Sequence, residues 1–162
     1  REKNVISLLE IFKEANIPYD WKLQIIGDGK EKNNLEKFVE ENQLKNRVIF
    51  HGTKNSNEIL ELLRKSKIFG FTSLKEAFGN VLVEAIFCGN VVISYDCNYG
   101  PSDIINENIG FLINLNNQQA FKTALEKLIN DKSLMNKMAQ NSISYSQEWK
   151  KEEILKKWNN IL

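Results

Sequence analysis

The sequence predicts an α/β fold in which a parallel sheet carries helices on both faces. Short apolar runs of strand length alternate along the chain with segments whose apolar residues recur at helical spacing. Several of these runs are apolar at consecutive positions, which is typical of strands buried on both faces. Ligands bind such sheets at the carboxyl ends of the strands, so the loops that follow the strands are the candidate sites.

The chain opens with a helix, because apolar residues at positions 5, 8, 9 and 12 recur at helical spacing. The run WKLQII at residues 21–26 predicts a strand that ends at the turn sequence GDG. Residues 30–42 predict an amphipathic helix. The run RVIF at residues 47–50 then predicts a second strand, which ends at the sequence HG.

The middle of the chain continues the alternation. Residues 56–66 predict a helix with Ser56 as its N-cap, and the run IFGFT at residues 68–72 predicts a third strand. A helix over residues 80–88 ends at Gly89. The run VVISY at residues 91–95 predicts the fourth strand.

The last third of the chain is mainly helical. Pro101 is expected at the first position of a short helix, and the run GFLI at residues 110–113 predicts a short fifth strand. Two or three helices are expected from residue 117 to residue 162, with Tyr145, Trp149 and Trp158 as packing residues. No repeat or linker divides the chain, so we expect residues 1–162 to form one domain.

The composition excludes several classes of function. The chain has 162 residues, 42% hydrophobic and 27% charged, with a net charge of +1, which gives no electrostatic argument for nucleic acid. It lacks an apolar run long enough to cross a membrane. Residues 1–12 lack the h-region and the small-residue cleavage site that are typical of a signal peptide. Cys88 and Cys97 are interpreted as reduced cytoplasmic thiols. His51 is the only histidine, and no cluster has metal-ligand spacing, so we expect no metal.

The loop and helix at residues 73–84 form the strongest candidate site. Gly79 allows close backbone approach, and the N–H groups of Asn80, Val81 and Leu82 at the helix start suit a phosphate. Glu76 lies in the loop, where a glutamate is usually only solvated.

Glu84 lies one turn into the same helix, in a segment whose other residues are apolar, small or uncharged, as expected of a buried core. A buried carboxylate is costly unless it is hydrogen-bonded. Two interpretations stay open from the residues alone: bonding to nearby backbone groups or water, and contact with ligand hydroxyls.

The other strand-end loops carry weaker signals. The sequence GDGK at residues 27–30 lacks the third glycine of a dinucleotide fingerprint and is also an ordinary turn. His51 is interpreted as a strand-end residue rather than a catalytic base. The sequence YGPS at residues 99–102 is either a helix start, the preferred interpretation, or one wall of a cleft.

The motifs taken in order resemble a known family. The sequences LQIIGDGK, RVIFHG, SLKEAFGNVLVEAIFCGNVVIS, YGPSDII and GFLI are similar to the C-terminal, nucleotide-sugar-binding domain of family 4 retaining glycosyltransferases, the glycosyl transferases group 1. The similarity covers nearly the whole chain. It implies a Rossmann-like domain that forms one half of a GT-B fold.

The resemblance implies roles for individual residues. Glu76 would contact the donor sugar, Glu84 would bind the ribose hydroxyls, and Lys3 would neutralise the diphosphate, which makes Glu76 and Lys3 the catalytic candidates. The other donor-binding residues that it implies are Gly79, Asn80 and Val81 at the diphosphate, Thr53 near the base, and Phe78 and Gly27.

Three departures from the family pattern bear on these roles. Ala77 replaces a common glycine beside the donor sugar, and Asn90 replaces a common proline. A strand that ends in Gly-Arg before the lysine has no counterpart, since Arg1 is too close to Lys3 to be that arginine. We therefore expect a fragment without its first strand and its N-terminal acceptor domain, which binds donor weakly and transfers nothing alone.

The implied function is transfer of a sugar from a nucleotide diphosphate sugar to a glycan or lipid-linked acceptor, in bacterial surface polysaccharide or capsule synthesis. The nucleotide is expected to be UDP, with GDP as the other choice. We expect no metal cofactor and no nucleic-acid partner. The expected location is the cytoplasm, with peripheral association of the whole enzyme at the inner face of the membrane. Two alternatives are a sugar-nucleotide epimerase-like domain and a non-catalytic nucleotide-sugar-binding subunit.

Overall fold

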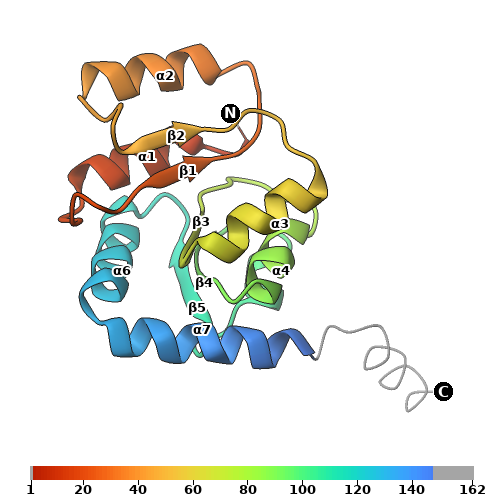
Figure 1. Ribbon diagram of the computed structural model, residues 1–162. Coiled ribbons are helices and arrows are strands. Elements are labelled where there is room, and N and C mark those ends of the chain that lie inside the picture. The colour runs from red at the N-terminus through yellow and green to blue at the C-terminus, as the bar shows by residue number, and fades with distance from the viewer. Residues whose placement is uncertain (1, 148–162) are drawn as a thin grey trace.

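The computed structural model describes residues 2–147, which form an α/β domain (Figure 1). Arg1 and the helical residues expected beyond residue 147, with Trp149 and Trp158, lie outside the described residues. Tyr145 lies inside them and packs against a buried core cluster, as predicted. In chain order the elements are α1 (Val5–Glu14), β1 (Leu23–Ile25), α2 (Lys32–Glu41), β2 (Val48–Phe50), α3 (Ser56–Lys65), β3 (Ile68–Phe71), α4 (Asn80–Phe87), β4 (Val91–Asp96), α5 (Pro101–Ile104), β5 (Gly110–Asn114), α6 (Gln118–Asn130) and α7 (Lys132–Ser146).

The strands are parallel, as the sequence predicts, but they form two sheets among residues 2–147 rather than one. β1 pairs with β2, and β4 pairs with β3 on one side and β5 on the other. β1 and β3 are not paired with each other. The apolar runs predict strands correctly, but no feature of a run says which strand will be its neighbour.

β4 is the only described strand that is buried along nearly its whole length, and it divides the core in two. Val91, Ile93 and Tyr95 point into a core that α1, α2 and α6 line, whereas Val92 points into a second core with α3, α4 and α5. This is the period-two alternation of a strand covered by helices on both faces. The outer strands are less buried than predicted, and Ile49 of β2 is exposed because β2 is an edge strand.

The N-cap of α3 differs from the prediction. Asn55, not Ser56, caps this helix: its side chain accepts a hydrogen bond from the backbone N–H of Glu58 at 3.0 Å. The Glu58 carboxylate accepts one from the Asn55 backbone N–H at 3.0 Å, which completes a capping box. Asn55 has the extended backbone that a cap requires, and Ser56 is already the first helical residue. The prediction that Pro101 begins a short helix is confirmed.

Replacing Asn55 by alanine should lower the free energy of unfolding by about 1 kcal/mol, because the backbone N–H of Glu58 loses its acceptor. The melting temperature should fall by about 2 to 4 °C. Ser56→Ala is the matched control and should leave the melting temperature nearly unchanged. A larger loss in Ser56→Ala than in Asn55→Ala would contradict this assignment of the cap.

Candidate functional site

The candidate site lies at the carboxyl end of β3, where the N-terminal segment meets the loop that leads to α4. The backbone N–H of Leu74 donates to the carbonyl of Glu2 at 2.8 Å. The buried Thr72 hydroxyl donates to the carbonyls of Asn4 and Lys3, at 3.0 and 3.3 Å. These bonds fix residues 2–4 beside the end of the strand. No sequence pattern points to this role of Thr72, because a threonine at a strand end has no distinctive signature.

Lys3 and Glu76, the two predicted catalytic residues, are brought together although 73 positions separate them. The Lys3 ammonium donates to a carboxylate oxygen of Glu76 and lies 5.9 Å from the centre of the Phe71 ring. The Glu76 side chain is only 18% exposed, whereas that of Lys3 is 62% exposed. Glu76 is therefore not the merely solvated loop glutamate that its position in the sequence suggested.

Gly79 sets the start of α4. Its backbone is left-handed, with φ of 89°, and a Cβ there would lie 2.9 Å from a methyl group of Leu82. The amides of Asn80 and Val81 follow at the helix start, where a helix offers them no acceptor of its own. The Leu82 amide is not free as predicted, since it donates to the Gly79 carbonyl at 2.8 Å. This helix start therefore offers two amides to an anion rather than three.

Glu84 is exposed, so it is not a carboxylate inside the core. Leu82, Ala85 and Ile86 form the buried face of α4, and Glu84 lies on the opposite face with Asn80 one turn before it. The 3.6-residue period puts positions four apart on one face, which explains how an acidic residue fits an apolar segment. A ligand contact by Glu84 stays a prediction.

The remaining predicted donor residues lie in other loops. Thr53 is exposed in the loop after β2, and Gly27 follows β1, where its N–H donates to the Gly52 carbonyl at 2.8 Å. Both belong to the first sheet, whereas Lys3 and Glu76 lie at the second. Phe78 is 43% exposed in the loop before α4. His51 forms a hydrogen bond of 3.0 Å with Gln24, which agrees with its interpretation as a strand-end residue.

Gly100, the N-cap residue of α5, packs against the loop before α4. It has φ of 106°, and a Cβ on it would overlap the backbone carbonyl of Phe78. An isolated β-bridge between Lys75 and Asn98 joins the same two loops. From the sequence, residues 99–102 are expected to be a helix start or a cleft wall. The helix start is confirmed, since α5 begins here, and its N-cap glycine packs against the loop that carries Glu76. The cleft wall stays a prediction.

Cys97 follows β4 and is buried next to this site. Burial raises the pKa of the Cys97 thiol, and the negative charges of Glu76 and Asp96 raise it further, so the thiol stays protonated at neutral pH. Within residues 2–147 there is no group of three or more His, Cys, Asp or Glu side chains that could hold a metal ion. None of the helices in that range has the length and apolar character needed to cross a membrane.

Comparison with known proteins gives one family. The model described as "Glycosyl transferases group 1" matches residues 1–145. The amylovoran biosynthesis glycosyltransferase AmsD of Erwinia amylovora is 34% identical over 161 residues, which are 99% of this chain and 45% of that protein. The poly(ribitol-phosphate) alpha-N-acetylglucosaminyltransferase of Staphylococcus aureus is 30% identical over 145 residues, 86% of this chain and 28% of that protein.

Solved structures show the same fold. A variant of S. aureus TarM in complex with Fondaparinux, alpha-GlcNAc-glycerol and UDP has a TM-score of 0.86 and 26% identity over 99% of this chain and 33% of that one. The C-terminal domain of the group 1 glycosyl transferase LpcC from Francisella tularensis has a TM-score of 0.83 and 28% identity, over 93% of this chain and 81% of that one. The chain thus spans less than half the length of the curated relatives compared above.

Replacing Gly100 by alanine should destabilise the domain by about 3 kcal/mol or more, because the left-handed backbone is strained and the new Cβ displaces the loop at Phe78. Urea unfolding measures this loss. Gly29→Ala is the control, since a Cβ at Gly29 meets nothing within 4 Å and its φ is not left-handed. Equal stability of the two variants would contradict the close approach of the two loops.

Proposed function

We propose that this chain, which belongs to the glycosyl transferases group 1 family, is the donor-binding part of a retaining glycosyltransferase. It takes a UDP-linked sugar, and the whole protein transfers that sugar to a glycan or lipid-linked acceptor in bacterial surface polysaccharide synthesis. The observation that carries the proposal is the pairing of Lys3 with Glu76 next to the helix start at Gly79.

The charges at this site suit a departing nucleoside diphosphate. Negative charge develops on the diphosphate as the glycosidic bond breaks, and preorganised positive groups stabilise it. Lys3 supplies a full positive charge, and the amides of Asn80 and Val81 supply the partial charge of a helix N-terminus. These groups suffice to bind a diphosphate without a metal ion.

Donor binding exchanges the partners of Lys3 and Glu76. The exposed Lys3 ammonium leaves the Glu76 carboxylate for the diphosphate, whose charge is larger. Glu76, whose side chain is only 18% exposed, then accepts hydrogen bonds from the sugar hydroxyls. Glu84, exposed on α4 beside Asn80, accepts hydrogen bonds from the ribose. Thr53, Phe78 and Gly27 line the path to the base.

The relatives support the nucleotide and the stereochemical outcome. The TarM variant that this chain resembles was solved with UDP and alpha-GlcNAc-glycerol, and the S. aureus relative is named an alpha-N-acetylglucosaminyltransferase. An alpha-linked nucleotide sugar that yields an alpha-linked product is transferred with retention. The amylovoran relative supports polysaccharide synthesis as the process. Acceptor binding and transfer belong to the whole protein in this proposal, so the chain alone binds donor and transfers nothing.

Titration of the chain with UDP, GDP and their sugars tests the proposal through the melting temperature and calorimetry. UDP should raise the melting temperature more than GDP does, since a ligand that binds only the folded state stabilises it.

Glu84→Gln should weaken UDP binding about tenfold, because one charge-assisted hydrogen-bond acceptor is lost. Glu61→Gln, an exposed glutamate on α3, is the control and should bind UDP unchanged. Loss of folding in Glu84→Gln without loss of affinity would assign this residue a structural role.

Lys3 and Glu76 should give opposite effects on UDP. Lys3→Met should weaken UDP binding about tenfold or more, because a charged partner of the diphosphate is lost. Glu76→Gln should bind UDP at least as well as the original chain, because the lysine is no longer paired, yet lose the added affinity of UDP-sugar over UDP. Calorimetry measures both, with Lys75→Met as the control lysine of the same loop.

In the whole protein, Glu76→Gln should reduce kcat more than KM. Full activity of this variant would favour the alternative of a non-catalytic nucleotide-sugar-binding subunit. Weaker UDP binding in Glu76→Gln would contradict the exchange of partners.

A further inference from the structure

The loop that follows β4 carries a tyrosine whose backbone is strained. Tyr99 has φ of 69°, in the left-handed region that residues other than glycine seldom adopt. The other non-glycine residues with positive φ among residues 2–147 are Asn4, Gln43 and Asn116, which all carry an amide side chain. Asparagine tolerates this conformation, whereas a bulky aromatic residue is an outlier there. Strain of this kind is often retained at functional sites, so Tyr99 calls for a functional explanation.

The Tyr99 side chain is also the most exposed of the large apolar and aromatic side chains of residues 2–147, at 70%. It makes no hydrogen bond, ion pair or ring contact with another residue of that range. Tyr19, which is 66% exposed, differs because the charged groups of Lys22 and Arg47 lie 4.9 and 5.7 Å from the centre of its ring. Folding therefore gains little from the Tyr99 ring, and its surface is open to a ligand.

Both neighbours of Tyr99 are fixed against the loop before α4, which belongs to the candidate site. Asn98 forms an isolated β-bridge with Lys75. Gly100 lies so close to Phe78 that a Cβ on it would be 1.8 Å from the Phe78 carbonyl oxygen. The backbone therefore holds Tyr99 beside the candidate site without any contribution from the tyrosine side chain.

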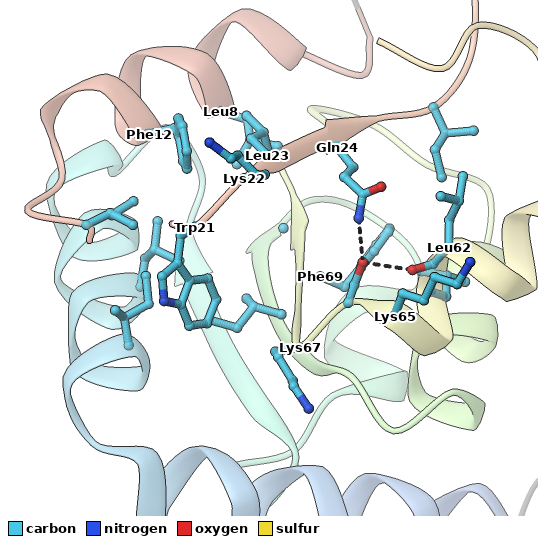
Figure 2. A pocket seen from close by; sticks show the side chains of 18 of the residues that line it. Leu8, Phe12, Trp21, Lys22, Leu23, Gln24, Leu62, Lys65, Lys67 and Phe69 are labelled. Atoms are coloured by element: carbon cyan, nitrogen blue, oxygen red, sulfur yellow. Dashed lines mark hydrogen bonds between the residues drawn. The ribbon is translucent and has the colours of Figure 1, made fainter. Parts of the chain in front are cut away.

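The order of the strands puts this loop on the side of β3 that faces away from the first sheet. The first sheet lies beside β3, across a cavity of about 390 Å³ that Leu23 and Gln24 of β1 line together with Phe69 of β3 (Figure 2). β4 pairs with β3 on its other side. A ligand that extends from the first sheet past the end of β3 therefore reaches the loop after β4 next.

This order fits the three parts of a nucleotide sugar. The proposed function puts the base near the loops of the first sheet, and the diphosphate at Lys3 and the start of α4, next to β3. The sugar is attached at the other end of the diphosphate, so it extends past Glu76 toward Tyr99.

A sugar ring offers two kinds of surface to a protein. Its hydroxyl groups form hydrogen bonds, for which the Glu76 carboxylate is an acceptor, and its C–H groups form an apolar face against which an aromatic ring can pack. We propose that Tyr99 packs against the apolar face of the donor sugar and so helps to select which sugar is transferred. This inference rests on the proposed function, from which it takes the position of the sugar. Because Asn98 and Gly100 fix the loop before a donor binds, little conformational entropy is lost when the ring makes this contact.

The test measures two Tyr99 variants by calorimetry with UDP, UDP-glucose and UDP-N-acetylglucosamine. Tyr99→Gly should weaken binding of the preferred UDP-sugar about fivefold to tenfold, because the aromatic surface is lost, and should leave the affinity for UDP nearly unchanged. Tyr99→Phe retains the ring and should keep the ratio of the affinity for the UDP-sugar to that for UDP.

Tyr99→Gly should also raise the melting temperature by about 2 to 4 °C, because glycine adopts the left-handed backbone without strain. A gain in stability together with a loss of sugar recognition is expected of a residue that is retained for binding. A lower melting temperature together with weaker binding of UDP itself would assign Tyr99 a structural role and overturn the inference.

Two matched controls separate the ring from the strain. Asn116→Gly relieves a left-handed backbone in the turn after β5, and Tyr19→Ala removes a similarly exposed tyrosine ring before β1. Both controls should keep the ratio of the affinity for the UDP-sugar to that for UDP.

The outcomes distinguish this inference from the proposed function. An unchanged ratio in Tyr99→Gly, with UDP still bound, would overturn the role of Tyr99 and leave the proposed function standing. Failure of the original chain to bind UDP would overturn the proposed function and this inference with it. Equal loss of the ratio in Tyr99→Phe would assign the contact to the hydroxyl, against packing by the ring. In the whole protein, a raised KM for the acceptor with an unchanged KM for the donor would assign Tyr99 to the acceptor instead of the donor sugar.

Discussion

The contact between residues 2–4 and the end of β3 positions the charged pair of the candidate site. The Leu74–Glu2 and Thr72–Asn4 hydrogen bonds fix the chain just before α1. They place the Lys3 ammonium against Glu76.

Close backbone packing gives the site its shape. Gly79 turns the chain into α4 with a left-handed backbone, and Gly100 lets a second loop approach the Phe78 carbonyl. Side chains at either position would push the Glu76 loop away from β3. The half-buried Glu76 therefore depends on two glycines that contact no ligand themselves, and its position is set before a donor arrives. Such preorganisation is what electrostatic stabilisation of a leaving group requires.

The sequence predicts the elements well because apolar runs and helical spacing report burial directly. The sequence is a poor guide where the outcome depends on the backbone conformation or on contacts between distant parts of the chain. Asn55 and Ser56 are both good caps, and only the backbone conformation decides between them. Glu84 looked buried because its sequence neighbours are apolar, yet the helical period turns it to solvent. Strand pairing is a long-range property, so the gap between β1 and β3 left no trace in either run. The Lys3–Glu76 pair followed from the family resemblance and not from spacing.

The Lys3–Glu76 pair also explains how one site can hold a charged lysine and a charged carboxylate before and after donor binding. Without donor, each charge neutralises the other, and the half-buried Glu76 carboxylate has a partner. With donor, the lysine has the diphosphate and the carboxylate has hydroxyl donors, so neither is left unpaired. The exchange costs little, because the Lys3 side chain is 62% exposed and water reaches the ammonium that changes partner. Breaking the Lys3–Glu76 pair therefore reduces the affinity for a nucleotide sugar only slightly. The same two side chains can contact opposite sides of the bond that is cleaved: Lys3 the diphosphate and Glu76 the sugar.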